Sequence, residues 1–158
     1  MDGNFDADRY SLARIADRVG TPFFLYDAAI LRERLKRLNA LTEGPHLQGR
    51  FAMKANSSRK VLEMVRDAGL WIDAVSGNEV LRARRAGFAM GARPPVVLFT
   101  ADVFRDNALT VVLEHGVLPN LGSPGMIADL RGAGYKGGLP AQIEQLRHLV
   151  ILHFQRQA

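Results

Sequence analysis

Hydrophobic residues in this chain follow two spacings that alternate along its length. From residue 49 onward, short apolar runs recur at intervals of roughly two dozen residues, with helix-like stretches between them. Each run is compact, as is typical of a strand covered on both faces. The runs occupy residues 50–55, 71–76, 96–100 and 117–121. The pattern predicts four strand–helix units and a parallel sheet.

The stretches between the runs carry signals for the beginning and end of helices. Ser57 or Ser58 can cap the first helix and Ser76 precedes the second, while Pro124 suits the first turn of the fourth. Glycine follows the helical stretches, as expected of left-handed C-caps. These glycines are Gly69, Gly87, Gly116 and one of residues 132–134.

The two ends of the chain differ from this repeating plan. Residues 10–19 predict an amphipathic helix closed by Gly20, and residues 21–27 a short strand. Asp27 is placed to cap a helix over 28–41. Residues 139–158 have apolar positions at near-helical spacing and predict one helix rather than a fifth unit.

The composition is that of a globular domain. The chain has 158 residues, of which 47% are hydrophobic and 23% charged, so one domain with a sizeable core is expected. It has no cysteine, which excludes disulfides, thiolate metal sites and cysteine nucleophiles. The acidic start lacks the features of a secretory signal, and charges interrupt every apolar run. We expect a cytoplasmic protein with no membrane partner.

The net charge of +5 and pI near 10.1 raise the question of a polyanionic partner. The dense basic runs, 32–37 and 82–85, lie in helix-like patterns and fit solvated outer faces. No nucleic-acid partner is therefore expected. The four histidines have no metal-ligand spacing, since His148 and His153 are five residues apart, and no metal site is predicted.

Lys54 ends the first predicted strand and precedes a polar turn and a helix. Ligands and catalytic groups collect at that edge of parallel α/β sheets. A solvated surface lysine is the alternative interpretation of the pattern. Further polar residues lie at or near predicted strand ends and are candidates for a cofactor pocket, although each is also a good cap, turn or backbone-bonding residue. They are Asn56, Asp73, Ser76, Glu79 and Thr100.

Three ordered segments, residues 20–27, 51–57 and 72–79, resemble the successive N-terminal motifs of the ornithine, diaminopimelate and arginine decarboxylase family. The resemblance covers residues from about 10 to 135. It implies the first part of a TIM (β/α)8-type barrel of the alanine-racemase kind, left incomplete. It also implies that Lys54 is the catalytic lysine that carries pyridoxal 5'-phosphate, and that Asp73 and Glu79 match acidic positions near it.

Lysine suits this task because its amine condenses with an aldehyde once it has lost its proton. The reference pKa of the amine is about 10.4, and a partly buried barrel mouth is expected to lower it. The cofactor ring can then accept the electron pair left by a departing carboxylate.

The resemblance stops near residue 137, so we assign residues 1–137 to the barrel part and 138–158 to a divergent helical tail. In the family, the region beyond this point supplies the phosphate grip, the acidic partner of the ring nitrogen, a stacking histidine and substrate residues from a neighbouring subunit. The resemblance implies a lyase acting on diaminopimelate in lysine synthesis, here truncated and with an incomplete site; ornithine and arginine remain alternative substrates. The alternative is a non-catalytic half barrel that binds itself or a full-length decarboxylase subunit.

Overall fold

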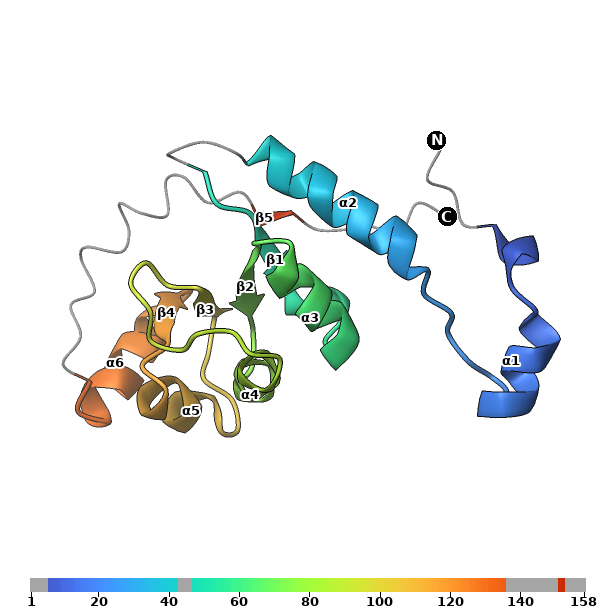
Figure 1. The fold of residues 1–158 in the computed structure, drawn as a ribbon. Coiled ribbons are helices and arrows are strands. Elements are labelled where there is room, and N and C mark those ends of the chain that lie inside the picture. The colour runs from blue at the N-terminus through green and yellow to red at the C-terminus, as the bar shows by residue number, and fades with distance from the viewer. Residues whose placement is uncertain (1–5, 43–46, 136–150, 153–158) are drawn as a thin grey trace.

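Parallel strands form a single sheet in the part of the chain that the structure, a computed structural model, describes: residues 6–42, 47–135 and the backbone of 151–152. The strand order is β4-β3-β2-β1-β5, and each neighbouring pair is parallel (Figure 1). The strands are β1 Arg50–Ala52, β2 Trp71–Ala74, β3 Val97–Ala101, β4 Leu118–Leu121 and β5 Ile151–Leu152.

A helix follows each of the first four strands, which confirms the predicted alternation of strands and helices. The helices are α1 Leu12–Val19, α2 Ala28–Leu41, α3 Arg59–Asp67, α4 Gly77–Arg85, α5 Ala108–Glu114 and α6 Pro124–Gly132, with short 3-10 helices η1 Ala7–Arg9 and η2 Met53–Ala55. The predicted bounds of α2 are correct, because the Asp27 carboxylate accepts the Ala29 and Ile30 amides and fixes where the helix begins.

The core lies between the helices and one face of the sheet. Phe51, Ile72 and Phe99 alternate with residues of the opposite face and pack with Leu62 and Val65 of α3. Phe99 is fully buried, and burial of a side chain of this size contributes about 1.5–3 kcal/mol. The other face of the sheet is called here the inner face. It carries Arg50, Ala52, Asp73, Leu98 and Thr100, the alternate positions of β1, β2 and β3.

Two predicted strands differ from the structure by more than two residues, whereas those at 71–76, 96–100 and 117–121 lie within two residues of the bounds of β2, β3 and β4. The first one ends at Ala52, not residue 55, because Met53–Ala55 turn into η2. The strand predicted at residues 21–27 is absent, since these residues pair with no strand among the described residues. Phe24 in this segment is 81% exposed.

The tail also differs from its prediction where it is described. Ile151–Leu152 form β5 beside β1 instead of continuing a helix, with Arg50 opposite Ile151 and Phe51 opposite Leu152. A physical reason is that β5 supplies backbone partners to the outer edge of β1, which a helix cannot do. Residues 136–150 and 153–158, which hold the rest of the predicted tail helix, lie outside the described residues.

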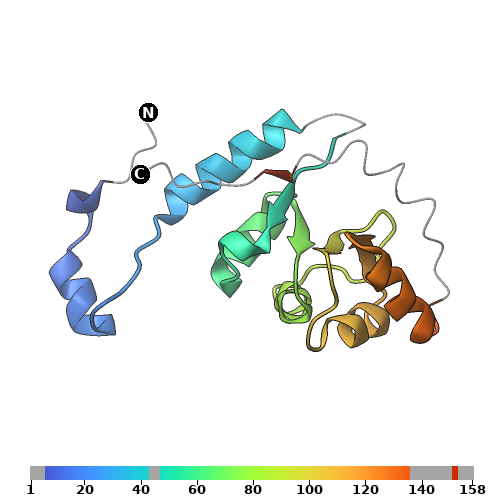
Figure 2. The same ribbon diagram turned by 180° about the vertical axis from the view of Figure 1, so that it is seen from behind.

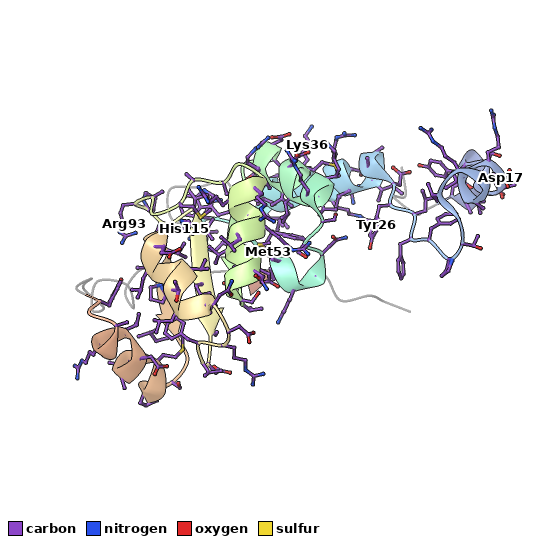
Figure 3. All side chains as sticks on the ribbon, turned by 90° about the horizontal axis from the view of Figure 1, so that it is seen from below. Asp17, Tyr26, Lys36, Met53, Arg93 and His115 are labelled. Carbon is purple, nitrogen blue, oxygen red and sulfur yellow. The ribbon has the colours of Figure 1, made fainter. Side chains whose placement is uncertain are left out.

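The N-terminal part extends away from the sheet. Helix α1 has no buried residue and stands apart from α3 to α6, and an extended segment joins it to α2 (Figure 2). Figure 3 shows Asp17 on α1 far from Met53, with Tyr26 between them. The Tyr10 hydroxyl donates to the Asp27 carboxylate and ties this part of the chain to the start of α2.

Candidate functional site

Lys54 lies in the turn where the chain leaves β1. The Met53 side chain is 1% exposed and anchors η2 in the core, whereas Lys54 is exposed. The partial burial expected for this amine is therefore wrong in this structure. The turn places Lys54 at the carboxyl end of the sheet, where a small molecule can reach it.

Asp73 and Thr100 meet on the inner face, at the carboxyl ends of β2 and β3. The Thr100 hydroxyl donates to Asp73 Oδ1 over 2.6 Å. Asp73 is 4% exposed and pairs in register with Ala52, two residues before Lys54. The register therefore brings the end of β2 to the turn that carries Lys54.

Ser76 and Glu79 form a reciprocal cap at the start of α4. The Ser76 hydroxyl accepts the Glu79 amide at 3.2 Å, and Glu79 Oε2 accepts the Val75 amide at 2.7 Å. This arrangement resembles a capping box, except that the glutamate accepts the amide of Val75, one residue before the N-cap Ser76, instead of the N-cap amide. The capping interpretation therefore describes the hydrogen bonds of both residues in this structure.

The Glu79 carboxyl also interacts electrostatically with Lys54. Its carboxyl is partly buried, and burial raises its pKa above the usual range; the nearby Asp73 carboxylate raises it further. The bond from the Val75 amide and the positive charges of Lys54 and Arg82 lower the pKa of Glu79 in part. Lys54 and Asp73 therefore both act electrostatically on the Glu79 carboxyl.

Asn56 follows η2 and makes a local hydrogen bond at the entry to α3. Its Oδ1 accepts the Ser58 amide at 2.9 Å and leads the chain into α3. Ser58 stands at the N-cap of α3, but its side chain makes no capping bond, so the predicted serine cap is wrong there. The turn role therefore applies to Asn56.

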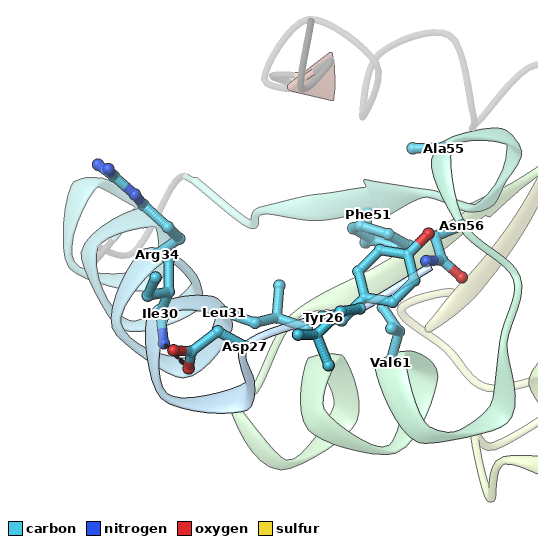
Figure 4. A pocket seen from close by; sticks show the side chains of 10 residues that line it. Tyr26, Asp27, Ile30, Leu31, Arg34, Phe51, Ala55, Asn56 and Val61 are labelled. Atoms are coloured by element: carbon cyan, nitrogen blue, oxygen red, sulfur yellow. Dashed lines mark hydrogen bonds between the residues drawn. The ribbon is translucent and has the colours of Figure 1, made fainter. Parts of the chain in front are cut away.

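A pocket of about 480 Å³ lies next to Asn56, on the side of β1 that faces α2. Its lining is mainly apolar, and Tyr26, Phe51 and Asn56 are among the residues that line it (Figure 4). Arg34 extends away from the Tyr26 ring (Figure 4). Lys54 does not line this pocket, although its neighbour Ala55 does.

The sequence reasoning missed Arg50. This residue begins β1 on the inner face and is 4% exposed. The available signal was a guanidinium inside an otherwise apolar strand, since a buried arginine requires partners for its donors.

The described residues contain no cluster of three or more histidine or carboxylate side chains able to hold a metal ion. Within the same ranges, no helix combines the length and the apolar character needed to cross a membrane.

Residues 28–143 match the family model described as pyridoxal-dependent decarboxylase, pyridoxal binding domain. The chain belongs to this family. Lys54, Asp73 and Glu79 all lie within the matched range.

Curated relatives and solved structures support the membership. Diaminopimelate decarboxylase of Streptomyces coelicolor is 38% identical over 130 residues, which are 80% of this chain and 27% of the relative. The enzyme of the same name from Escherichia coli K12 is 34% identical over 125 residues, 79% of this chain and 29% of that protein.

A crystal structure of a diaminopimelate decarboxylase aligns with a TM-score of 0.67 at 32% identity, over 77% of this chain and 28% of that one. Lysine decarboxylase from Selenomonas ruminantium, at 18% identity and a TM-score of 0.66, shows the fold alone. The predicted family and partial barrel fold are therefore confirmed. The chain spans less than a third of the length of the curated relatives it matches.

Proposed function

We propose that Lys54 is the attachment point for pyridoxal phosphate in a site of the diaminopimelate decarboxylase type. The observation that carries the proposal is an exposed lysine at the carboxyl end of β1, whose charge acts on the Glu79 carboxyl, inside a matched pyridoxal binding domain. In parallel α/β sheets this edge is where ligands bind.

The described residues fit the aldehyde end of such a cofactor. Lys54 would offer an accessible amine to that aldehyde, and the Glu79 carboxyl interacts electrostatically with the same amine. When bound, pyridoxal phosphate supplies an electron sink for the pair left by a departing carboxylate.

The residues of the chain have separate parts in this proposal. Lys54 Nζ must lose a proton before it can bind the cofactor, and it can move protons when released. Glu79, whose pKa is raised by burial, is suited to hold or return a proton near Lys54. The Thr100 hydroxyl donates to the Asp73 carboxylate and orients it.

Decarboxylation itself is proposed to need further residues. The relatives named diaminopimelate decarboxylase extend well beyond the part that this chain matches. We therefore expect cofactor capture by this chain alone, with weak or no release of carbon dioxide from diaminopimelate.

An absorbance titration with pyridoxal phosphate tests the proposal. The wild-type chain is expected to shift the cofactor spectrum with a saturable dependence on concentration, and Lys54→Ala is expected to remove this shift. Lys60→Ala is the matched control, because Lys60 lies on α3, exposed and paired with Glu63 at 2.9 Å. Equal spectra for wild type and Lys54→Ala would reject the proposal. Carbon dioxide release from diaminopimelate, ornithine and arginine then ranks the substrates.

A second candidate function is association with another copy of the chain or with a full-length decarboxylase subunit. Large apolar side chains exposed near the N-terminus favour it, with Val19 62%, Phe24 81% and Tyr26 60% exposed. Sedimentation of the chain alone and mixed with a full-length subunit tests this candidate. A monomer under both conditions would contradict it.

A further inference from the structure

The Arg50 side chain extends from β1 to backbone carbonyls of β2 and of the segment before β3. Its Nη1 donates to the Ile72 carbonyl at 2.9 Å and its Nη2 to the Pro95 carbonyl. A longer bond of 3.4 Å joins Nη1 to the Val96 carbonyl. The guanidinium thereby ties the start of β3 to β1 and β2.

The Arg50 guanidinium is desolvated. The side chain is 4% exposed, its Nε has no hydrogen-bond partner among the described residues, and its Cζ lies 5.0 Å from the centre of the Trp71 ring. A buried charge of this kind is stable only where neighbours compensate for the lost water. Carbonyl dipoles and the aromatic face supply part of this compensation.

The opposite charge comes from Asp73. Arg50 pairs with Trp71 and Ala52 pairs with Asp73, so Arg50 and Asp73 lie diagonally on the same inner face. Burial lowers the pKa of Arg50 to about 10, and the Asp73 carboxylate counteracts that lowering. The interaction is mutual, because a charge that stabilises the guanidinium is itself stabilised by it.

We infer that Arg50 is a positioning residue whose buried guanidinium, diagonal to Asp73 on the same inner face, stabilises the negative charge of the Asp73 carboxylate at the carboxyl end of β2. The hydrogen bonds of Arg50 go to backbone carbonyls, so its proposed effect on the site passes through Asp73. The inference rests on the proposed function only where it concerns Lys54.

Other charged groups act on the same cluster. Lys54 in η2 and Arg82, about one turn after Glu79 on α4, both act on the Glu79 carboxyl, as Asp73 does. Their contributions differ from that of Arg50 in one respect: Arg50 is buried and therefore weakly screened by salt. The effect of Arg50 on Asp73 should persist at high ionic strength.

Carboxyl ¹³C NMR of aspartate-labelled full-length chain tests the inference without any cofactor. Asp73, assigned through Asp73→Asn, is expected to be ionised at pH 7 in the wild type. Its titration midpoint is expected to rise by about one pH unit or more in Arg50→Gln, which keeps a donor and loses the charge. Arg50→Lys should restore most of the midpoint, and Arg84→Gln, at an exposed position of α4, should leave it unchanged. A protonated Asp73 in the wild type, or an unchanged midpoint in Arg50→Gln, would overturn the inference.

A stability cycle keeps the inference testable where Arg50→Gln does not fold. Arg50→Met and Asp73→Asn each leave one buried charge without the other, whereas the double variant leaves neither. We expect the double variant to unfold at a higher urea concentration than Arg50→Met alone. Additive losses would contradict the coupling.

Cofactor affinity tests, independently of the NMR titration, whether Arg50 matters for the proposed function. Arg50→Gln is expected to weaken the apparent affinity for pyridoxal phosphate, and Arg50→Lys to recover it. Absence of cofactor binding in the wild type would reject the proposed function while leaving the NMR result intact. A midpoint that shifts without any change in cofactor affinity would reject the positioning role and leave the charge pair.

Discussion

The hydroxyl of Thr100 donates to Asp73 Oδ1 over 2.6 Å and joins the carboxyl ends of β3 and β2. Asp73 is 4% exposed, so few water molecules can replace this donor. The bond therefore holds a buried carboxylate in one orientation next to the turn that carries Lys54.

Thr100→Val preserves the shape of the side chain and removes the donor. Because a buried acceptor then loses its partner, we expect the free energy of unfolding to fall by about 1–3 kcal/mol. Urea denaturation measures it. Thr110→Val is the control, since Thr110 is exposed on α5, and should change stability by no more than about 0.5 kcal/mol. Equal effects of the two variants would show that the Thr100 bond is unimportant.

Glu79 and Glu63 are expected to respond to pH in opposite directions. Burial raises the pKa of Glu79 from 4.5, so the folded state binds the proton more tightly. Its contribution to stability is complete below pH 4.5 and is lost as pH rises through the folded pKa. Hydrogen bonds from Lys60 and Arg59 lower the pKa of Glu63, whose contribution is present above 4.5 and is lost as pH falls through its folded pKa.

Unfolding measured across this pH range in Glu79→Gln and Glu63→Gln checks the signs. Relative to the wild type, Glu79→Gln should gain stability as pH rises through the window above 4.5. Glu63→Gln should lose its difference from the wild type as pH falls below 4.5. The same sign for both variants would refute the assignment.

The close packing of α4 against the start of α5 depends on Gly77. A Cβ at this position would lie 2.4 Å from Asn107 Oδ1 and 3.0 Å from Ala108 Cα. Gly77→Ala should therefore destabilise the chain by roughly 1–3 kcal/mol through overpacking. Gly132→Ala, near the end of α6 with no atom within 4 Å of the added Cβ, should be neutral or stabilise by up to about 1 kcal/mol. Thermal unfolding that ranks the two variants in the reverse order would refute the close approach.

Strand β5 protects the outer edge of β1. Leu152→Pro removes a backbone donor and restricts the chain, so the β1 amides that face β5 should exchange faster with deuterium. Ile151→Val retains β-propensity and is the control. Unchanged exchange at residues 50–52 in the proline variant would mean that β5 does not cover this edge.

Signals confined to neighbouring residues allowed much of the fold to be predicted. Asp27 and the leucines of 28–41 determined α2, and alternating apolar runs with glycine stops determined the four strand–helix units. Spacing could not separate a strand from a helix at Ile151–Leu152, because short apolar runs suit either and the open edge of β1 is a tertiary feature. The position of Arg50 in an apolar strand was a signal that it needs partners, but the partners themselves could not be predicted, since these carbonyls lie 22 to 46 residues away.

The candidate site was likewise only partly predictable from the sequence. Lys54 could be singled out from its motif, but its exposure depends on the η2 turn. Ser76 and Asn56 were ambiguous in sequence, and hydrogen bonds to Glu79 and Ser58 determined their local roles. Such bonds depend on side-chain geometry that residue types alone do not specify.

Selective attachment to Lys54 is the central claim, and borohydride trapping tests it most directly. The chain has four lysines, Lys36, Lys54, Lys60 and Lys136, so unselective modification would spread among them. After incubation with pyridoxal phosphate, reduction and peptide mapping, the account predicts that most of the adduct is on Lys54 at substoichiometric cofactor. An adduct spread evenly over the lysines, or absent from Lys54, would contradict it.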